Sequence, residues 1–84
     1  MRVTVFNANI RGCEVKESKT TGKQYLLVRY EDETGAPEQV ADHNTARQSL
    51  YKRNTEGTLY LEIITGRTKT GSYANISITD FVPQ

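Results

Sequence analysis

The stretch SKTTGKQYLLVRYEDETGAP, residues 18–37, decides the fold class, because it places a strand-like run between two turn signals. Residues 24–31 are dense in Tyr, Leu and Val, which pack well on a pleated sheet. The loop before this run and the turn after it contain glycine, proline and small polar residues, which favour turns. The pattern predicts a β-strand that forms a hairpin with the strand before it.

The preceding run, residues 2–17, alternates apolar and polar residues with two interruptions. The alternation changes phase near Phe6, because Val5 lies on one side of the strand and Ala8 on the other. A β-bulge or bend at this point would accommodate the change. Gly12 marks a candidate second irregularity.

The rest of the chain reads as shorter elements separated by turns. In order these are a short third strand at residues 38–41, a helix at 46–53, a fourth strand at 58–65, a basic loop at 66–71 and a fifth strand at 73–82. Asn44 or Thr45 would cap the helix, and Asn54 and Gly57 would end it. Five strands with a helix between the third and fourth follow the order of the OB fold. We therefore expect an all-β protein, a small five-stranded antiparallel OB-like barrel, with another antiparallel barrel or sandwich as the alternative.

Length and composition limit the organisation of the chain. Its 84 residues contain no repeat or linker, so we expect a single OB-like domain over residues 1–84. A core of this size typically leaves only ~3–5 kcal/mol of stability, and a homodimer would supplement it. The only cysteine, Cys13, fits a reducing compartment. The N-terminal residues lack a signal-peptide pattern and no apolar stretch is long enough to span a bilayer, so we expect a cytoplasmic protein without membrane contact.

The sequence contains no recognisable catalytic motif. His43 is the only histidine, and Asp42 beside it has no third partner that would complete a catalytic group. No phosphate-binding glycine loop and no set of metal ligands is present. We therefore expect a protein that is not an enzyme and has no cofactor, metal ion or small-molecule substrate, and we interpret His43 as a surface or strand-end histidine.

Basic and aromatic residues alternate in two loops and in the strands that they join. Proteins that bind single-stranded nucleic acids need cations along the phosphates and flat rings on which unpaired bases stack. The period of a strand places four residues on one face: Lys23, Tyr25, Leu27 and Arg29. The candidate nucleic-acid site comprises the two clusters Lys16, Lys19, Lys23, Tyr25, Arg29 and Tyr30, and Arg67, Lys69 and Tyr73. A third basic group lies on or after the expected helix: Arg47, Lys52 and Arg53. Cations are common at helix ends and on solvated surfaces, so we leave this group out of the site.

Two of these segments carry a resemblance to a known family. The segment KTTGKQYLL, residues 19–27, is similar to the basic hairpin tip and base-stacking tyrosine of the gene V single-stranded-DNA-binding proteins of filamentous phages. The segment KTGSY, residues 69–73, is similar to their aromatic-tipped loop near the dimer dyad. The resemblance implies a dimeric OB-like protein that coats single-stranded DNA in the bacterial host. It implies that Lys23 and Tyr25 contact DNA, and that Tyr73 serves a strand bound mainly by the partner subunit.

The resemblance has limits along the chain. It does not extend over residues 32–56, and Asp80 stands where the family tends to be basic. The sequence thus predicts a non-catalytic homodimer that coats single-stranded DNA in phage or mobile-element replication. Two alternatives stay open: an RNA-binding OB-like domain, which would use the same stacking, and a protein-interaction accessory module. The latter is favoured by the net charge of +1 and by the acidic turn at residues 31–33.

Overall fold

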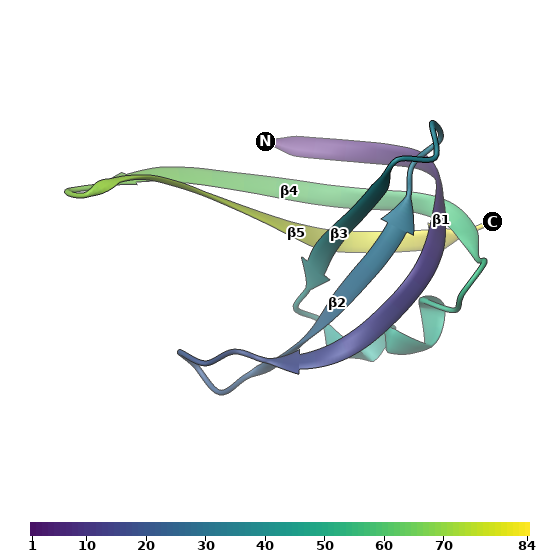
Figure 1. Ribbon diagram of the computed structural model, residues 1–84, viewed down its shortest axis with the longest axis horizontal. Coiled ribbons are helices and arrows are strands. Elements are labelled where there is room, and N and C mark those ends of the chain that lie inside the picture. The colour runs from purple at the N-terminus through teal and green to yellow at the C-terminus, as the bar shows by residue number, and fades with distance from the viewer.

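A computed structural model, which describes residues 1–84, shows an all-β protein with one short helix (Figure 1). In chain order the elements are β1 (Arg2–Glu17), β2 (Gln24–Glu31), β3 (Pro37–Asp42), the 3-10 helix η1 (Thr45–Leu50), β4 (Glu56–Thr68) and β5 (Gly71–Pro83). The strands close into a barrel in the order β1-β2-β3-β5-β4. The predicted five-stranded OB-like barrel, with its helix between the third and fourth strands, is confirmed.

One pair of neighbouring strands differs from the prediction of a fully antiparallel barrel. β3 and β5 run parallel and meet where Ala41 lies opposite Ser77, whereas the other four neighbouring pairs are antiparallel. The reason is geometrical. Around a closed ring of five strands, direction cannot alternate at every step, so one neighbouring pair must run the same way.

Both irregularities expected in β1 are present, and they let this strand pair with two partners. The ladder with β4 shifts register between Val5 and Ala8, where Asn7 adopts a left-handed backbone conformation with φ 55°. The ladder with β2 shifts between Ile10 and Gly12. The strand therefore bends, pairing with β4 along its first half and with β2 along its second (Figure 1).

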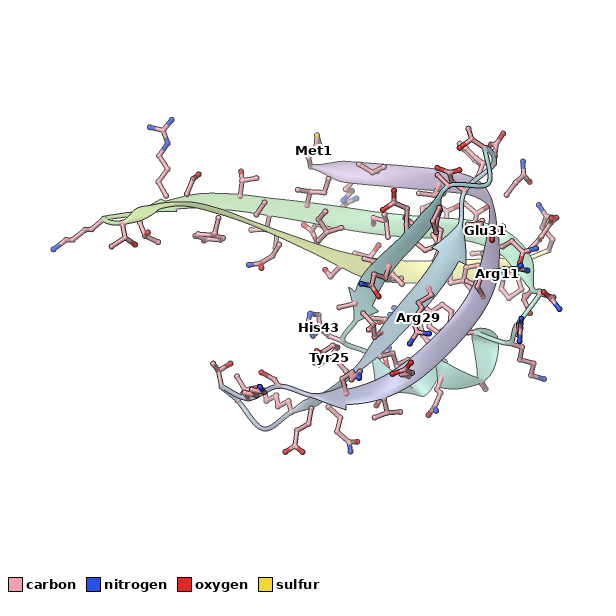
Figure 2. The ribbon with its side chains drawn as sticks, in the orientation of Figure 1. Met1, Arg11, Tyr25, Arg29, Glu31 and His43 are labelled. Atoms are coloured by element: carbon pink, nitrogen blue, oxygen red, sulfur yellow. The ribbon has the colours of Figure 1, made fainter.

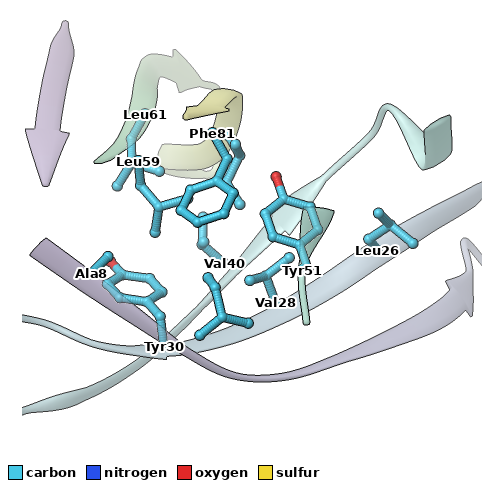
Figure 3. Packing of buried hydrophobic residues seen from close by; sticks show 11 residues of the cluster. Ala8, Leu26, Val28, Tyr30, Val40, Tyr51, Leu59, Leu61 and Phe81 are labelled. Carbon is cyan, nitrogen blue, oxygen red and sulfur yellow. The ribbon is translucent and has the colours of Figure 1, made fainter. Parts of the chain in front are cut away.

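The core fills the barrel with side chains from all five strands and from the residue after η1 (Figure 3). Tyr51 and Phe81 stack in it with ring centroids 5.3 Å apart. The cluster consists of Ala8, Ile10, Leu26, Val28, Tyr30, Val40, Tyr51, Leu59, Leu61, Ile78 and Phe81. Because these residues face inward, the alternate residues of β2 face outward and form the surface on which the predicted site lies.

The helix is shorter than predicted and of the 3-10 type. It begins after Asn44, whose side chain accepts a hydrogen bond from the backbone of Ala46, so the predicted cap is confirmed. It ends at Tyr51 rather than at Asn54, because Tyr51 turns inward to the core. With six residues, η1 is far too short to cross a membrane.

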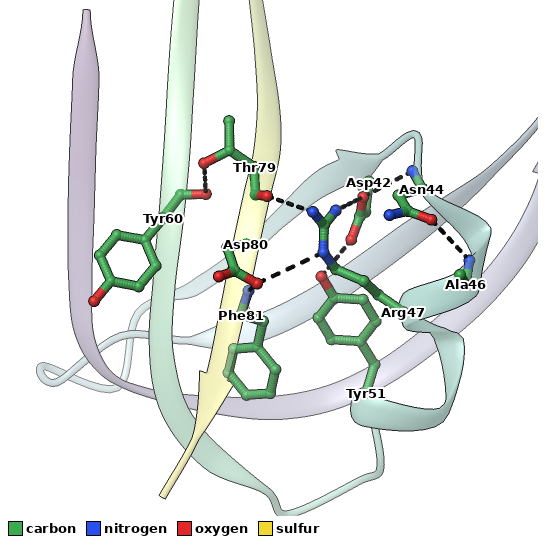
Figure 4. A network of polar contacts seen from close by, with 9 residues as sticks. All are labelled: Asp42, Asn44, Ala46, Arg47, Tyr51, Tyr60, Thr79, Asp80 and Phe81. Atoms are coloured by element: carbon green, nitrogen blue, oxygen red, sulfur yellow. Dashed lines mark hydrogen bonds and ion pairs between the residues drawn. The ribbon is translucent and has the colours of Figure 1, made fainter.

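A buried polar network attaches this helix to the barrel (Figure 4). The Asp42 carboxylate is fully buried and accepts hydrogen bonds from the Tyr51 hydroxyl at 2.5 Å and from the Arg47 guanidinium at 2.8 Å. Arg47 also donates to the backbone carbonyl of Thr79 in β5. A buried carboxylate is tolerated only when it is paired and hydrogen-bonded in this way. The network thus joins the end of β3, η1 and β5.

The predicted basic loop at residues 66–71 is mostly strand. β4 continues to Thr68 and β5 begins at Gly71, so the turn itself is only Lys69 and Thr70. Beyond the core, residues 63–76 form a two-stranded ribbon that projects from the barrel and is called the arm below (Figure 1). Residues 66–71 lack the alternation of apolar and polar residues that indicates a strand with one buried face. Their sequence therefore predicts a loop.

Candidate nucleic-acid interface

The outer face of β1, β2 and β3 brings most of the first predicted cluster together. The registers place side chains in rows across the strands, with Lys16 opposite Tyr25, Glu14 opposite Leu27, and Gly12 opposite Arg29. On the far side of β2, Leu27 lies opposite Ala41 and Arg29 opposite Gln39. The predicted common face of β2 is confirmed for Tyr25, Leu27 and Arg29, which alternate with the core residues Leu26, Val28 and Tyr30. Lys23, the fourth predicted member, lies in the loop before the strand.

Tyr30 does not belong to this face. Its side chain lies in the core with 7% of its surface exposed. Burial raises the pKa of its hydroxyl, with a smaller contribution from nearby Glu38. Tyr30 and Tyr25 are an odd number of residues apart on one strand, so they point to opposite sides of the sheet. Its inclusion in the site was wrong, because a buried ring has no free face for a base.

Tyr25 has an aromatic neighbour that the sequence analysis did not assign to the site. The ring of His43, which follows β3, lies 5.9 Å from the Tyr25 ring with an interplanar angle of 47° (Figure 2). Tyr25 is half-buried and His43 is exposed. The β2–β3 register brings His43 beside Tyr25, because His43 follows Asp42, the residue opposite Leu26. No residue pattern in the sequence gives this register.

Carboxylates moderate the positive charge of the strand face. Glu14 forms ion pairs with both Lys16, at 3.2 Å, and Arg29. Glu31 pairs with Arg11 at 3.3 Å, and the two arginines with Glu31 line a shallow hollow (Figure 2). Arg11 was missed because it is the extra residue of the bulge before Gly12, so simple alternation misplaces it. A lysine has three N–H donors and an arginine has five. The cations of this face that pair with a carboxylate therefore still have N–H groups available to a ligand.

The four other predicted cations carry unpaired charge at two hairpin tips. Lys19 and Lys23 lie in and beside the β1–β2 turn, and Arg67 and Lys69 lie at the end of the arm. All four are exposed, and none forms an ion pair. OB-fold proteins bind oligonucleotides with the face of strands 2 and 3 and with the loops between strands 1 and 2 and strands 4 and 5. The unpaired cations occupy these two loops.

The arm presents Tyr73 on one side and Arg67 on the other. Tyr73 lies opposite Gly66, and Arg67 lies opposite Ser72, the next pair along the ribbon, so the two side chains point to opposite faces. A Cβ built on Gly66 would lie 2.4 Å from the Tyr73 ring, so the ring rests against the glycine backbone. Tyr73 remains 47% exposed. The two predicted clusters lie on different hairpins, the first on β1 and β2 and the second on the arm formed by β4 and β5.

The third basic group lies apart from this face. Arg47 is committed to Asp42 in the buried network, while Lys52 and Arg53 are exposed after η1. Two further exposed apolar side chains, Ile64 and Ile76, lie on the arm with about half of their surface open. They contribute nothing to the core of a single chain.

Comparisons of this chain with protein-family models, with curated proteins and with solved structures find no match. The structure contains no group of three or more His, Cys, Asp or Glu side chains that could hold a metal ion. A function must therefore be inferred from the geometry and charge of the outer face and of the two hairpin tips.

Proposed function

We propose that this protein binds single-stranded DNA without strong sequence preference and catalyses no reaction. The observation that carries the proposal is the position of Tyr25. Its ring lies on the outer face of β2, opposite Lys16 and two residues from the unpaired Lys23. A ring for a base beside cations for phosphates is the combination that single-strand binding requires.

The two hairpin tips would hold the phosphate backbone. The cations of the two tips form no ion pair: Lys19 and Lys23 at one, and Arg67 and Lys69 at the other. Glu17, at the end of β1, is the one acidic residue beside the first tip. Each phosphate contact releases condensed counterions, which supplies affinity that does not depend on base sequence. Bases released from stacking with one another would then stack on Tyr25, and on Tyr73 at the arm.

The net charge of +1 does not prevent this binding, because the opposite charges are separated. The acidic turn begins at Glu31, the last residue of β2, whereas Lys23 precedes the first residue of this strand. Eight residues of strand span about 26 Å at ~3.3 Å per residue. Exposed charges are largely screened beyond about 8–10 Å at physiological ionic strength. The lysine tip would therefore act as a locally basic site.

The active form would be a homodimer that uses the arm as its interface. Ile76 exposes about half of its surface there, on the face of the ribbon opposite to Tyr73. A partner chain would cover Ile76 and leave the Tyr73 ring open to a base. The arm also lies outside the barrel, so its pairing would not disturb the core (Figure 1). Together with the resemblance of residues 19–27 and 69–73 to gene V proteins, this supports a role in coating single-stranded DNA during phage or mobile-element replication in a bacterial cytoplasm.

A competition experiment tests the proposal. Fluorescent oligo(dT) bound to the protein is displaced by unlabelled single-stranded DNA, single-stranded RNA of the same length, or duplex DNA. We expect single-stranded DNA to compete at the lowest concentration. Equal competition by duplex would contradict the proposal, and stronger competition by RNA would favour an RNA-binding domain. Lys52→Ala, which removes an exposed cation outside the site, serves as the control and should bind as the wild type does.

A further inference from the structure

We infer that His43 is a second base-stacking residue, which forms with Tyr25 a platform for two neighbouring bases of a bound single strand. This inference rests on the proposed function, since it extends the same binding face by one residue. It is carried by the geometry of the two rings, which lie side by side on the outer surface of the barrel (Figure 2).

The sheet places the two rings together. Leu26 in β2 lies opposite Asp42 at the end of β3, and Tyr25 and His43 are the next residues on each side. Side chains alternate across a sheet, so both rings point away from the buried Leu26 and Asp42. Lys16 lies opposite Tyr25 on β1. One row across three strands therefore presents an ammonium group, a phenol ring and an imidazole ring.

The imidazole of His43 makes no polar contact within the protein. His43 makes no side-chain hydrogen bond or ion pair, and its neighbour Asp42 points inward to Arg47 and Tyr51. The ring is exposed and lies outside the core cluster. Its contact with Tyr25, at 5.9 Å between centroids, falls within the range of favourable aromatic pairs. The imidazole is thus held in place on one side and open on the other.

The angle between the rings predicts the shape of the bound strand. Because the two planes are tilted by 47°, bases that stack on them cannot remain parallel to each other. Two consecutive bases would be splayed at this row, while Lys16 and Lys23 lie within reach of the adjoining phosphates. Every base has a flat face, so the platform would tolerate any sequence.

The test compares two probes in equilibrium titrations of the full chain: oligo(dT), and an oligomer of the same length with abasic sugars in place of nucleosides. We expect His43→Ala to weaken binding of oligo(dT) about tenfold, similar to Tyr25→Ala, and to leave binding of the abasic oligomer unchanged. His43→Trp keeps a ring and should bind oligo(dT) at least as well as the wild type. The wild-type chain contains no tryptophan, so the introduced residue is the only one in the variant. Stacking of a base on its indole ring should quench the tryptophan fluorescence. Gln48→Ala, an exposed position on η1, is the matched control.

Each outcome separates this inference from the function on which it rests. A wild-type protein that binds neither oligomer overturns the proposed function, and the inference with it. A wild type that binds oligo(dT), with His43→Ala equal to it in affinity, overturns the inference alone. An equal loss for oligo(dT) and for the abasic oligomer assigns His43 to the phosphates and overturns the stacking role. The melting temperature of His43→Ala should match that of the wild type, since the side chain is exposed.

Discussion

Gly66 and Tyr73 face each other across the arm, and the Tyr73 ring occupies the space that any side chain at position 66 would fill. Glycine within a strand costs stability because it packs nothing and loses more backbone entropy on ordering than other residues. An aromatic ring laid over it from the opposite strand restores part of the packing. The pair therefore orients Tyr73 on a ribbon that has no core of its own.

The first prediction concerns Gly66→Ala. The new methyl group would displace the Tyr73 ring from the backbone, and we expect oligo(dT) affinity to fall toward that of Tyr73→Ala. The melting temperature should change little, because the arm lies outside the core. Fluorescence anisotropy and a thermal melt measure the two effects. A Gly66→Ala variant that binds as tightly as the wild type, while Tyr73→Ala does not, would show that ring orientation is unimportant.

The second prediction separates Tyr25 from Tyr30. Tyr25→Ala should weaken oligo(dT) binding by about 1–3 kcal/mol, and Tyr25→Phe should weaken it much less, because the ring is the operative group. Tyr30→Ala should instead cost about 3–5 kcal/mol of folding stability, since Tyr30 is buried. Chemical denaturation and binding titrations of the three variants distinguish these effects. Unchanged affinity and a strongly lowered stability for Tyr25→Ala would remove Tyr25 from the site.

The third prediction concerns alkaline pH. Burial raises the pKa of the Tyr51 hydroxyl far above its ordinary value, and its hydrogen bond to the Asp42 carboxylate raises it further. An unfolded tyrosine loses its proton near pH 10, whereas Tyr51 keeps its proton in the folded state. The contribution of Tyr51 to stability should therefore be constant below about pH 10 and fall above it, because the unfolded state then binds fewer protons.

Tyr51→Phe is the variant that tests this origin of the pH dependence. It removes the hydroxyl, so its stability should fall less steeply above pH 10, although it should be lower at neutral pH by about 1.5–3 kcal/mol. The slope should not vanish, because the pKa of the buried Tyr30 is also raised. Urea unfolding at several pH values measures it. A slope identical to that of the wild type would mean that Tyr51 ionises equally in both states.

The fourth prediction concerns assembly through the arm. We expect a homodimer at micromolar concentration, and we expect Ile76→Lys to give a monomer, because it places a charge where the partner would bury an apolar side chain. Ile76 is 49% exposed in the single chain, so the substitution should spare the fold. Light scattering determines the mass of both proteins. A monomeric wild type would contradict the proposed dimer.

The alternation of apolar and polar residues predicted the strands that bury one face in the core. The change of phase near Phe6 located the bulge in β1, and the run from Gln24 to Glu31 gave the bounds of β2. The parallel contact between Ala41 and Ser77 could not be read in this way, because it arises only when the barrel closes. Within the arm the sequence predicts strands at residues 63–65 and 73–76 but a loop at 66–71, because side chains exposed on both faces of a ribbon need not alternate between apolar and polar.

The sequence predicted the site residues whose orientation follows from alternation along a strand. It did not predict those whose position depends on tertiary packing. Tyr25 and Arg29 share the outer face of β2 as expected, and Lys23 lies in the loop before this strand. The same parity should have excluded Tyr30, which was included on residue type alone. Gly12 indicated an irregularity in β1 but did not identify Arg11 as its extra residue. The residue pattern does not give the β2–β3 register that places His43 beside Tyr25.

The most direct test of single-strand binding is the salt dependence of oligo(dT) affinity, measured by fluorescence anisotropy over a series of sodium chloride concentrations. We expect the logarithm of the affinity to fall linearly with the logarithm of the salt concentration, since phosphate contacts release counterions. We also expect a shallower slope for a variant in which Lys19, Lys23, Arg67 and Lys69 are replaced by alanine, because these four cations are unpaired. Absence of binding at the lowest salt concentration, or affinity that does not change with salt, would contradict the account.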